Sequence, residues 1–324
     1  MIVPEFWAEA KENVVIDGKS RTYKRFGWSD VSEAVAMENA RERVAEAAAL
    51  ARQGEKVRLV DHKVSYNGAE GLPIREEIIA RHGDTVITRN SYGALCLNTP
   101  DVLFADVDVD ERANTTFAWV IFLLAALVGF WLRFEMNAWW PFVLFVVSGA
   151  ILAPALGMRM SQLFSARRAD PFDKALAGIE SFALTNTSWL LRVYRTPQGF
   201  RVLVMHSTFS PDAPEALGFM KQIESDELYV QMCRNQNCFR ARVSPKPWRI
   251  GMLHIRPRPG VWPIKKERLP DRQSWVRKYD EKAADYAACK YEKTLGKGRP
   301  SRRCEAVRSV HDSMCKSESD LPIA

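Results

Sequence analysis

The sequence lacks the motifs that mark several common enzyme classes and secreted proteins. It contains no Walker phosphate-binding loop, no dinucleotide-binding fingerprint, no G-x-S-x-G nucleophile motif and no H-E-x-x-H zinc motif. These absences argue against a P-loop nucleotidase, a Rossmann-type dehydrogenase, an α/β-hydrolase of the usual pattern and a zincin protease. The first residues show no basic segment followed by an apolar one, so we expect no cleaved signal peptide.

Paired cysteines are also absent. None of the six cysteines belongs to a C-x-x-C pair, and a chain of 324 residues does not need disulfides for stability, so we expect free thiols in a reducing cytosol. Cys233 and Cys238 are separated by four residues, and Cys304, His311 and Cys315 lie within one short segment. A zinc site composed of these residues is the alternative, but the spacing matches no familiar zinc motif, and we therefore predict scattered structural thiols.

Charge is missing from two long apolar stretches. Residues 115–132 and 138–158 contain no Asp, Glu, Lys or Arg, and five residues connect them. Because about 20 helical residues cross the hydrocarbon core of a bilayer, residues 115–158 are predicted to form a transmembrane hairpin in the lipid bilayer. A buried hairpin inside a soluble core is the alternative, and it is disfavoured because both stretches are apolar on all faces.

Basic residues follow the second apolar stretch and predict its orientation. Arg159, Arg167, Arg168 and Lys174 lie on that side, which the positive-inside rule assigns to the cytoplasm. Two spans return the chain to the side from which it started. We therefore expect an integral protein of the inner or plasma membrane with both termini cytoplasmic.

The remainder of the chain has the patterns of an α+β fold. Helices are predicted over residues 32–53, 73–81, 173–184, 214–224, 226–234, 271–296 and 303–316, and strands over 85–89, 92–97, 102–110, 189–194, 200–206 and 238–243. The strands on each side of the hairpin are too few for a stable sheet. We expect them to join one antiparallel sheet with flanking helices, interrupted by the two-helix transmembrane hairpin.

This organisation predicts four segments. Residues 1–113 form the cytoplasmic first part of the α+β domain, and residues 114–158 form the transmembrane hairpin. Residues 159–260 form the second part of the same domain. Residues 261–324 form a basic helical region.

Three aspartates alternate along the predicted strand before the hairpin. Asp106, Asp108 and Asp110 point to one face, because successive strand side chains alternate, while Val107 and Val109 point to the other. Neighbouring carboxylates repel one another, and a divalent cation relieves that repulsion. Mg²⁺ or Mn²⁺ prefers carboxylate oxygens together with phosphates and water, so the three aspartates are candidate metal ligands. A solvated acidic face is the alternative.

Arginines surround a turn in the second half of the domain. Thr196 to Gly199 form a predicted turn, in which Gly199 lets the backbone approach a ligand and Arg195 and Arg201 are candidate phosphate ligands. Arg240 and Arg242 share one face of a later strand, where they would bind phosphate or pair with the acidic strand. An ordinary hairpin with exposed arginines is the alternative.

The order of these features resembles the catalytic core of the archaeo-eukaryotic primases, the prim-pol family. An apolar strand ending in D-x-D is followed by a helix, a strand, a T-P-x-G turn and another strand. In that family the acidic pair binds metal, and a small-Gly-x-His motif binds the incoming nucleotide. Asp106 and Asp108 match the acidic pair, and Gly199 matches the glycine. Arg201 occupies the position of the family histidine, and His206 follows five residues later.

The resemblance covers about residues 85–243 with the hairpin removed. It implies nucleotidyl or phosphoryl transfer with Mg²⁺ or Mn²⁺, in which Asp106, Asp108 and Arg201 have catalytic roles. Asp226 and Asp271 are candidate positions for the third acidic motif of the family, which has no certain match in this chain.

Three functions therefore remain open. The first is a membrane-anchored domain that binds a nucleotide or nucleic acid through a divalent metal. The second is a non-enzymatic interaction or scaffold module with a protein partner. The third is a domain that binds anionic lipid, because residues 240–303 contain 19 lysines and arginines against six acidic residues.

Overall fold

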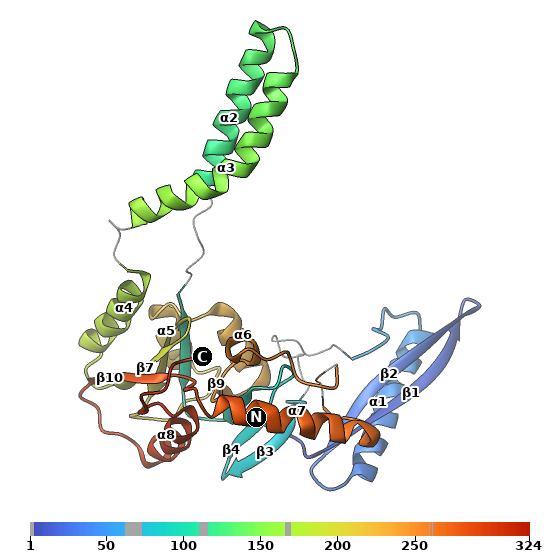
Figure 1. The fold of residues 1–324 in the computed structure, drawn as a ribbon. Helices are drawn as coiled ribbons and strands as arrows, with labels where there is room; N and C mark the ends of the chain where they lie inside the picture. Colours follow the sequence, from blue (N-terminus) through green and yellow to red (C-terminus); the bar gives the residue numbers. More distant parts are fainter. Residues whose placement is uncertain (1–2, 62–72, 110–115, 166–169, 259, 261) are drawn as a thin grey trace. The chain divides into compact units, whose positions relative to one another are not determined.

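The computed structural model describes residues 3–61, 73–109, 116–165, 170–258, 260 and 262–324 (Figure 1). The chain divides into two compact units. Met1–Asp108 and Gly178–Ala324 form the first, and Val109–Ala177 form the second. Asp110, Arg167 and Arg168, which the sequence assigns to the metal site and to the cytoplasmic flank, lie outside the described residues.

The helices and strands are given in chain order. The strands are β1 (Phe6–Ile16), β2 (Lys19–Ser29), β3 (Glu77–His82), β4 (Thr85–Arg89), β5 (Leu95–Thr99), β6 (Phe104–Asp108), β7 (Leu190–Thr196), β8 (Gly199–Val204), β9 (Phe239–Arg242) and β10 (Lys290–Gly296). The helices are α1 (Glu33–Arg52), α2 (Thr116–Glu135), α3 (Trp140–Ser165), α4 (Pro171–Thr185), α5 (Pro214–Gln222), α6 (Glu227–Gln236), α7 (Leu269–Ala283) and α8 (Arg302–Cys315). Two short 3-10 helices, η1 (Pro247–Ile250) and η2 (Lys266–Arg268), lie between β9 and α7.

The strands form three antiparallel sheets. The predicted α+β class is therefore confirmed, while the prediction of one single sheet is wrong. One four-stranded sheet has the order β10-β7-β8-β6, a second has the order β3-β4-β5-β9, and β1 pairs only with β2. Each four-stranded sheet combines strands from before and after α2 and α3. The acidic strand β6 and the arginine strand β9 consequently belong to different sheets.

The N-terminal hairpin was not expected from the sequence. Strands β1 and β2 pair along their whole length, from Phe6 opposite Ser29 to Ile16 opposite Lys19. Asp17 and Gly18 connect them with φ values of 51° and 73°, the conformation that two-residue hairpin turns require. Helix α1 packs against this hairpin and is capped by Ser32, whose side chain accepts a hydrogen bond from Val35 N.

Two predicted helices differ from the structure. The stretch 73–81 contributes to β3, which forms a hairpin with the fully buried strand β4 across Gly83, so strand pairing overrides the helical pattern. The predicted helix 271–296 is α7 only as far as Ala283, and the chain then enters β10. Strand β10 pairs with β7, so tertiary pairing overrides the local helical pattern there.

The second unit contains two helices that are long and apolar enough to cross a membrane. They cover Thr116–Glu135 and Trp140–Ser161, with 20 and 22 residues. Figure 1 shows them as an antiparallel pair. Gly157 faces Ala118 so closely that a Cβ atom on Gly157 would lie 2.8 Å from that of Ala118. Small residues at such contacts let two helices approach in a lipid environment.

Large apolar side chains cover the outer surfaces of this helix pair. Leu127, Trp131 and Ile151 are between 61% and 70% exposed within the structure. A soluble helix normally turns such side chains toward a core. Since no described residue of the unit covers them, the pair presents the surface expected of lipid-facing helices.

Candidate functional site

Strands β6 and β8 bring the two most prominent predicted site residues together. Asp106 is the direct partner of Arg201, and Asp108 is the direct partner of Gly199. Cross-strand partners lie on the same face of a sheet, so the candidate residues Asp106, Asp108 and Arg201 share one face, although the pairing of these two strands was not predicted. Val107 is buried on the opposite face. The alternation inferred for the described part of this strand is therefore confirmed.

Asp106 and Arg201 form a bidentate ion pair. Arg201 Nε donates to Asp106 Oδ1 at 2.8 Å, and Arg201 Nη2 donates to Asp106 Oδ2 at 3.1 Å. The Arg201 side chain is only 2% exposed, whereas that of Asp106 is 27% exposed. Burial alone would lower the pKa of Arg201, but the carboxylate of Asp106 raises it well above its ordinary value. Arg201 is therefore a permanently charged group in the interior.

Arg201 also connects the two four-stranded sheets. Its Nη1 donates to the backbone carbonyl of Arg242 on β9 at 2.7 Å. The backbone of Asp106 is held in turn by the loop before α6, since Ser225 Oγ and Asp226 N donate to its carbonyl at 2.8 and 2.9 Å. These contacts fix the end of β6 against β8, β9 and α6.

Carboxylates gather at the end of β6. Partial burial raises the pKa of Asp108, and the negative charges of Asp106 and Asp226 raise it further. Asp226 is also the N-cap of α6, where its Oδ1 accepts a hydrogen bond from Leu228 N at 3.1 Å. Asp226 was one of two positions considered for a third acidic residue, and the structure places its charge close to Asp108.

Cations crowd next to these carboxylates. Burial, together with the charges of Arg242 and Arg249, lowers the pKa of Lys246 to about 8, although Asp108 and Asp106 oppose that shift. Burial and Arg242 also lower the pKa of Arg249. Arg242 Nε and Arg249 Nη1 are buried and have no hydrogen-bond partner within the described parts of the chain. The site thus holds several mutually repelling cations with unused donors.

The turn between β7 and β8 contributes to this cation cluster. Gln198 Oε1 accepts hydrogen bonds from Arg249 Nη2 at 2.7 Å and from Lys246 Nζ at 3.4 Å. Gly199 has a φ of 149°, which side-chain-bearing residues rarely adopt, and it lies opposite Asp108. The turn at Gly199 therefore lies next to both the cation cluster and the acidic end of β6.

Arg240 and Arg242 share one face of β9, as predicted, but they have different partners. Arg240 Nη2 binds both oxygens of Glu76 at 2.7 and 2.6 Å, so its charge is already paired. Both arginines line a pocket of about 90 Å³ that also includes Asp106 and Tyr92. Of the two, Arg242 is the better candidate for a ligand contact.

Two residues singled out in the sequence lie away from this site. Arg195 pairs with Phe200, the neighbour of Arg201 on the other face of the sheet, and its guanidinium lies 5.1 Å from the centre of the Phe200 ring. His206 Nδ1 accepts a hydrogen bond from Leu190 N at 3.4 Å, and its ring packs against Trp189. Neither residue joins Asp106 and Arg201.

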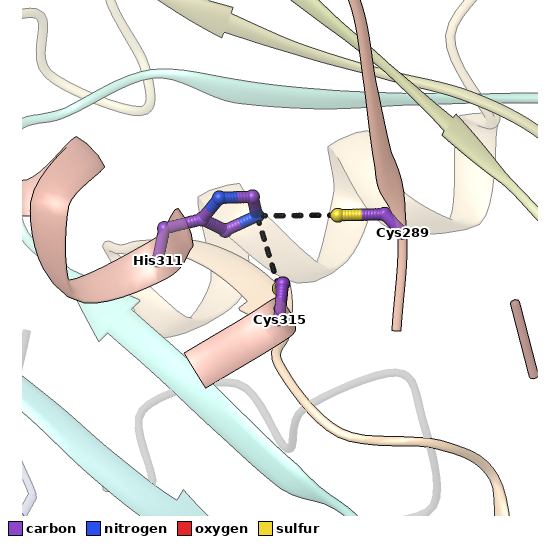
Figure 2. Close-up of side chains that lie close together, drawn as sticks. All are labelled: Cys289, His311 and Cys315. Atoms are coloured by element: carbon purple, nitrogen blue, oxygen red, sulfur yellow. Dashed lines mark hydrogen bonds between the residues drawn. The ribbon is translucent and has the colours of Figure 1, made fainter. Parts of the chain in front are cut away.

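A second cluster, of cysteine and histidine, was not expected from the sequence (Figure 2). Cys289, His311 and Cys315 have ligand atoms within 4.8 Å of one another, and no other group of three potential metal ligands this close occurs among the described residues. His311 Nε2 lies 3.5 Å from Cys315 Sγ and 4.0 Å from Cys289 Sγ. All three side chains are fully buried.

Charged groups surround this cysteine–histidine cluster. A hydrogen bond with Cys315, together with His311 and Arg201, lowers the pKa of the Cys289 thiol well below its ordinary value, even though burial opposes this. Burial and the neighbouring Cys289 raise the pKa of Cys315. On the other side of the imidazole, His311 Nδ1 lies 3.0 Å from Asp312 Oδ1. The His311–Asp312 contact was missed because neighbouring helical residues do not normally face each other.

The sequence did contain part of the signal for this cluster. His311 and Cys315 are four residues apart, which places them on one face of α8. Cys289 was hidden because residues 271–296 were expected to form one helix. Cys304, which the sequence grouped with His311 and Cys315, instead contacts Ser207 O, with Sγ at 3.3 Å. All six cysteines are buried and free.

Comparison of the chain with protein-family models, with curated proteins and with solved structures finds no match in any of the three.

Substituting one member of the Asp106–Arg201 pair is expected to destabilise β6 and β8 strongly. Asp106→Ala leaves a buried guanidinium without its counter-charge, a change that typically costs about 3–5 kcal/mol. The double variant Asp106→Ala with Arg201→Met removes both charges and should recover part of that loss. Hydrogen exchange of the β6 and β8 amides in the full chain measures both effects.

Lys293→Ala provides the control, because its pair with Glu180 is more than a third exposed on both sides. Such a pair contributes at most about 1 kcal/mol. If Asp106→Ala exchanges no faster than Lys293→Ala, the buried pair does not hold these strands.

Proposed function

We propose that this chain is an integral membrane protein whose α+β unit binds a phosphate-bearing ligand, a nucleotide or nucleic acid, together with a divalent cation. The observation that carries the proposal is the crowding of cations beside the acidic end of β6. Burial, together with the charges of Arg242 and Arg249, lowers the pKa of Lys246 to about 8, and burial and Arg242 also lower the pKa of Arg249. Such an arrangement costs stability unless an anion is bound, and phosphate oxygens are suitable acceptors.

The unused donors support a ligand with several oxygen atoms. Arg242 Nε and Arg249 Nη1 lack a partner among the described residues, and buried polar atoms are normally hydrogen-bonded. Gly199, at the adjacent turn, lies directly opposite Asp108 with a φ of 149°. A phosphate group at this position would satisfy the free donors and reduce the repulsion among the three cations.

The carboxylates suit a cation that arrives with the phosphates. Asp106, Asp108 and Asp226 do not form a group with ligand atoms within 4.8 Å in the described structure. Mg²⁺ and Mn²⁺ commonly use only one or two carboxylates when substrate phosphates complete the coordination. Asp108 is the best-placed residue, since it is exposed and adjacent to the other two charges.

Because Asp106 is already paired with Arg201, we propose that this site binds a ligand, and we propose no reaction there. Both oxygens of Asp106 already accept hydrogen bonds from Arg201, which occupies the position of the family histidine in the prim-pol resemblance. The second lone pair on each oxygen remains available to a metal. A transfer reaction would need further groups that the site geometry does not supply, so nucleotidyl transfer is not part of the proposal.

Membrane insertion is the second component of the proposed function. The exposed apolar surfaces of α2 and α3 and the absence of charged residues from 116–132 and 140–158 support it. Arg159 lies near the end of α3, and the basic residues that follow it in the sequence favour a cytoplasmic position for that flank. Both termini of the chain would then be cytoplasmic, on the same side as the phosphate site.

The membrane component predicts that the protein resists extraction by alkaline carbonate. Changing Leu127 and Val147 together to Arg should release it, because an arginine at the centre of a span costs about 2.5–3.5 kcal/mol. Leu184→Arg is the matched control, as Leu184 is 78% exposed outside both spans. Immunoblotting of pellet and supernatant gives the result. Release of the unchanged chain, or retention of the double variant, would contradict membrane insertion.

The phosphate site predicts Mn²⁺-dependent binding of a nucleoside triphosphate. Asp108→Asn should weaken that binding by about tenfold or more, since it removes a charged metal ligand. It is a cleaner test than a change at Asp106, which breaks the buried pair. Isothermal titration of the full chain in detergent measures the affinity, and Asp212→Asn, at an exposed carboxylate elsewhere, is the control. If the affinity is the same with and without Mn²⁺, or the same in Asp108→Asn as in the unchanged chain, the proposed metal site is wrong.

The lowered pKa of Lys246 predicts a pH dependence. Lys246 is protonated and attracts an anion below about pH 8, and it becomes neutral as the pH rises through that value. Affinity for a nucleoside triphosphate should therefore fall by about tenfold between pH 7 and pH 9, where the charge of the phosphates is nearly constant. Lys246→Arg should bind with little change over this range. A flat profile in the unchanged chain would exclude Lys246 as a ligand contact.

A further inference from the structure

We infer that Cys289, His311 and Cys315 form a zinc site that ties the strand β10 to the helix α8. The inference is independent of the proposed phosphate site. Cys289 immediately precedes β10, while His311 and Cys315 are one turn apart on α8 (Figure 2). The site thus joins two segments, because Cys289 and His311 are 22 positions apart in the sequence.

The distances between the ligand atoms fit tetrahedral zinc. Zinc bonds of about 2.3 Å to sulfur and about 2.0 Å to nitrogen place neighbouring ligand atoms roughly 3.5–3.8 Å apart. The separation is 3.5 Å between His311 Nε2 and Cys315 Sγ, and 4.0 Å between His311 Nε2 and Cys289 Sγ. Small side-chain rotations would therefore place all three atoms on one ion.

The histidine is already oriented as a zinc ligand. Its Nδ1 faces Asp312 Oδ1 at 3.0 Å, so a proton on Nδ1 leaves the Nε2 lone pair directed at the two sulfur atoms. A carboxylate on the distal nitrogen is the usual partner of a zinc-binding histidine. Asp312 is itself fixed, since Tyr194 Oη donates to it at 2.5 Å and Arg192 Nη2 lies 2.9 Å from its Oδ2.

The charge around the sulfur atoms favours a metal. The guanidinium of Arg201 interacts electrostatically with both Cys289 and Cys315. Zinc binds cysteine in the thiolate form. Two thiolates and one Zn²⁺ have no net charge, so the metal avoids an uncompensated charge in the interior.

The burial of the cluster favours a structural site. All three residues are fully buried, and the rings of Phe104 and Tyr194 lie 5.2 and 4.7 Å from the ring of His311. No fourth Cys, His, Asp or Glu atom joins the group among the described residues. A water molecule or another small ligand would complete the tetrahedron. Both cysteines coordinate zinc as thiolates, and any proton that they still hold is released to solvent.

Metal analysis of the full chain tests the inference. The protein is purified in detergent through a tag without histidine, and zinc is measured by mass spectrometry. We expect about one zinc per chain, and a loss of most of it in Cys289→Ser with Cys315→Ser. Cys304→Ser is the matched control, because Cys304 is fully buried on the same helix outside the cluster. It should keep its zinc.

Cobalt provides a readout that needs no variant. Replacing zinc with Co²⁺ in the unchanged chain should give the visible bands of tetrahedral cobalt and the thiolate-to-cobalt charge-transfer band. A folded protein that binds neither zinc nor cobalt would overturn the inference. So would a Cys289–Cys315 disulfide in the isolated protein, or full zinc retention in the double cysteine variant.

Discussion

The buried ion pair between Asp106 and Arg201 is the contact on which the organisation of the α+β unit depends. It joins β6 to β8 within one sheet, and the third donor of Arg201 binds the β9 backbone of the other sheet. The same guanidinium interacts with Cys289 and Cys315 behind it. Because a buried arginine without a counter-charge is strongly destabilising, the position of Asp106 constrains both sheets and both candidate sites.

This arrangement gives the two sides of Arg201 different chemistry. On one side, Asp106, Asp108 and Asp226 face the cations of β9 and η1, where hard oxygen ligands and phosphates belong. On the other side, two sulfur atoms and an imidazole suit a softer metal such as zinc. The inferred zinc would hold β10 and α8 together next to Arg201. Arg201 would in turn hold the end of β6 through its ion pair with Asp106.

Local patterns in the sequence predicted the site strands well. The alternation of Asp106 and Asp108 with Val107 predicted the faces of β6 correctly, and the predicted turn at Gly199 connects β7 and β8. The pairing of β6 with β8 was not predicted, and the considered pairing of the acidic strand with the strand of Arg240 and Arg242 is wrong. The Asp17–Gly18 turn carried an equally clear hairpin signal that was overlooked. The partners of the arginines were not predictable, because Glu76 meets Arg240 across 164 residues of sequence. Cys289 was missed for a related reason, since only the pairing of β10 with β7 brings it to α8.

A diffraction experiment on the full chain with Mn²⁺ and a nucleoside triphosphate tests the central claim most directly, because manganese can be located by its anomalous scattering. The account predicts a manganese peak beside Asp108, phosphate oxygens on Arg242, Lys246 and Arg249, and an intact Asp106–Arg201 pair. It would be contradicted by the absence of a manganese peak at the end of β6. Phosphates bound elsewhere on the α+β unit would contradict it equally.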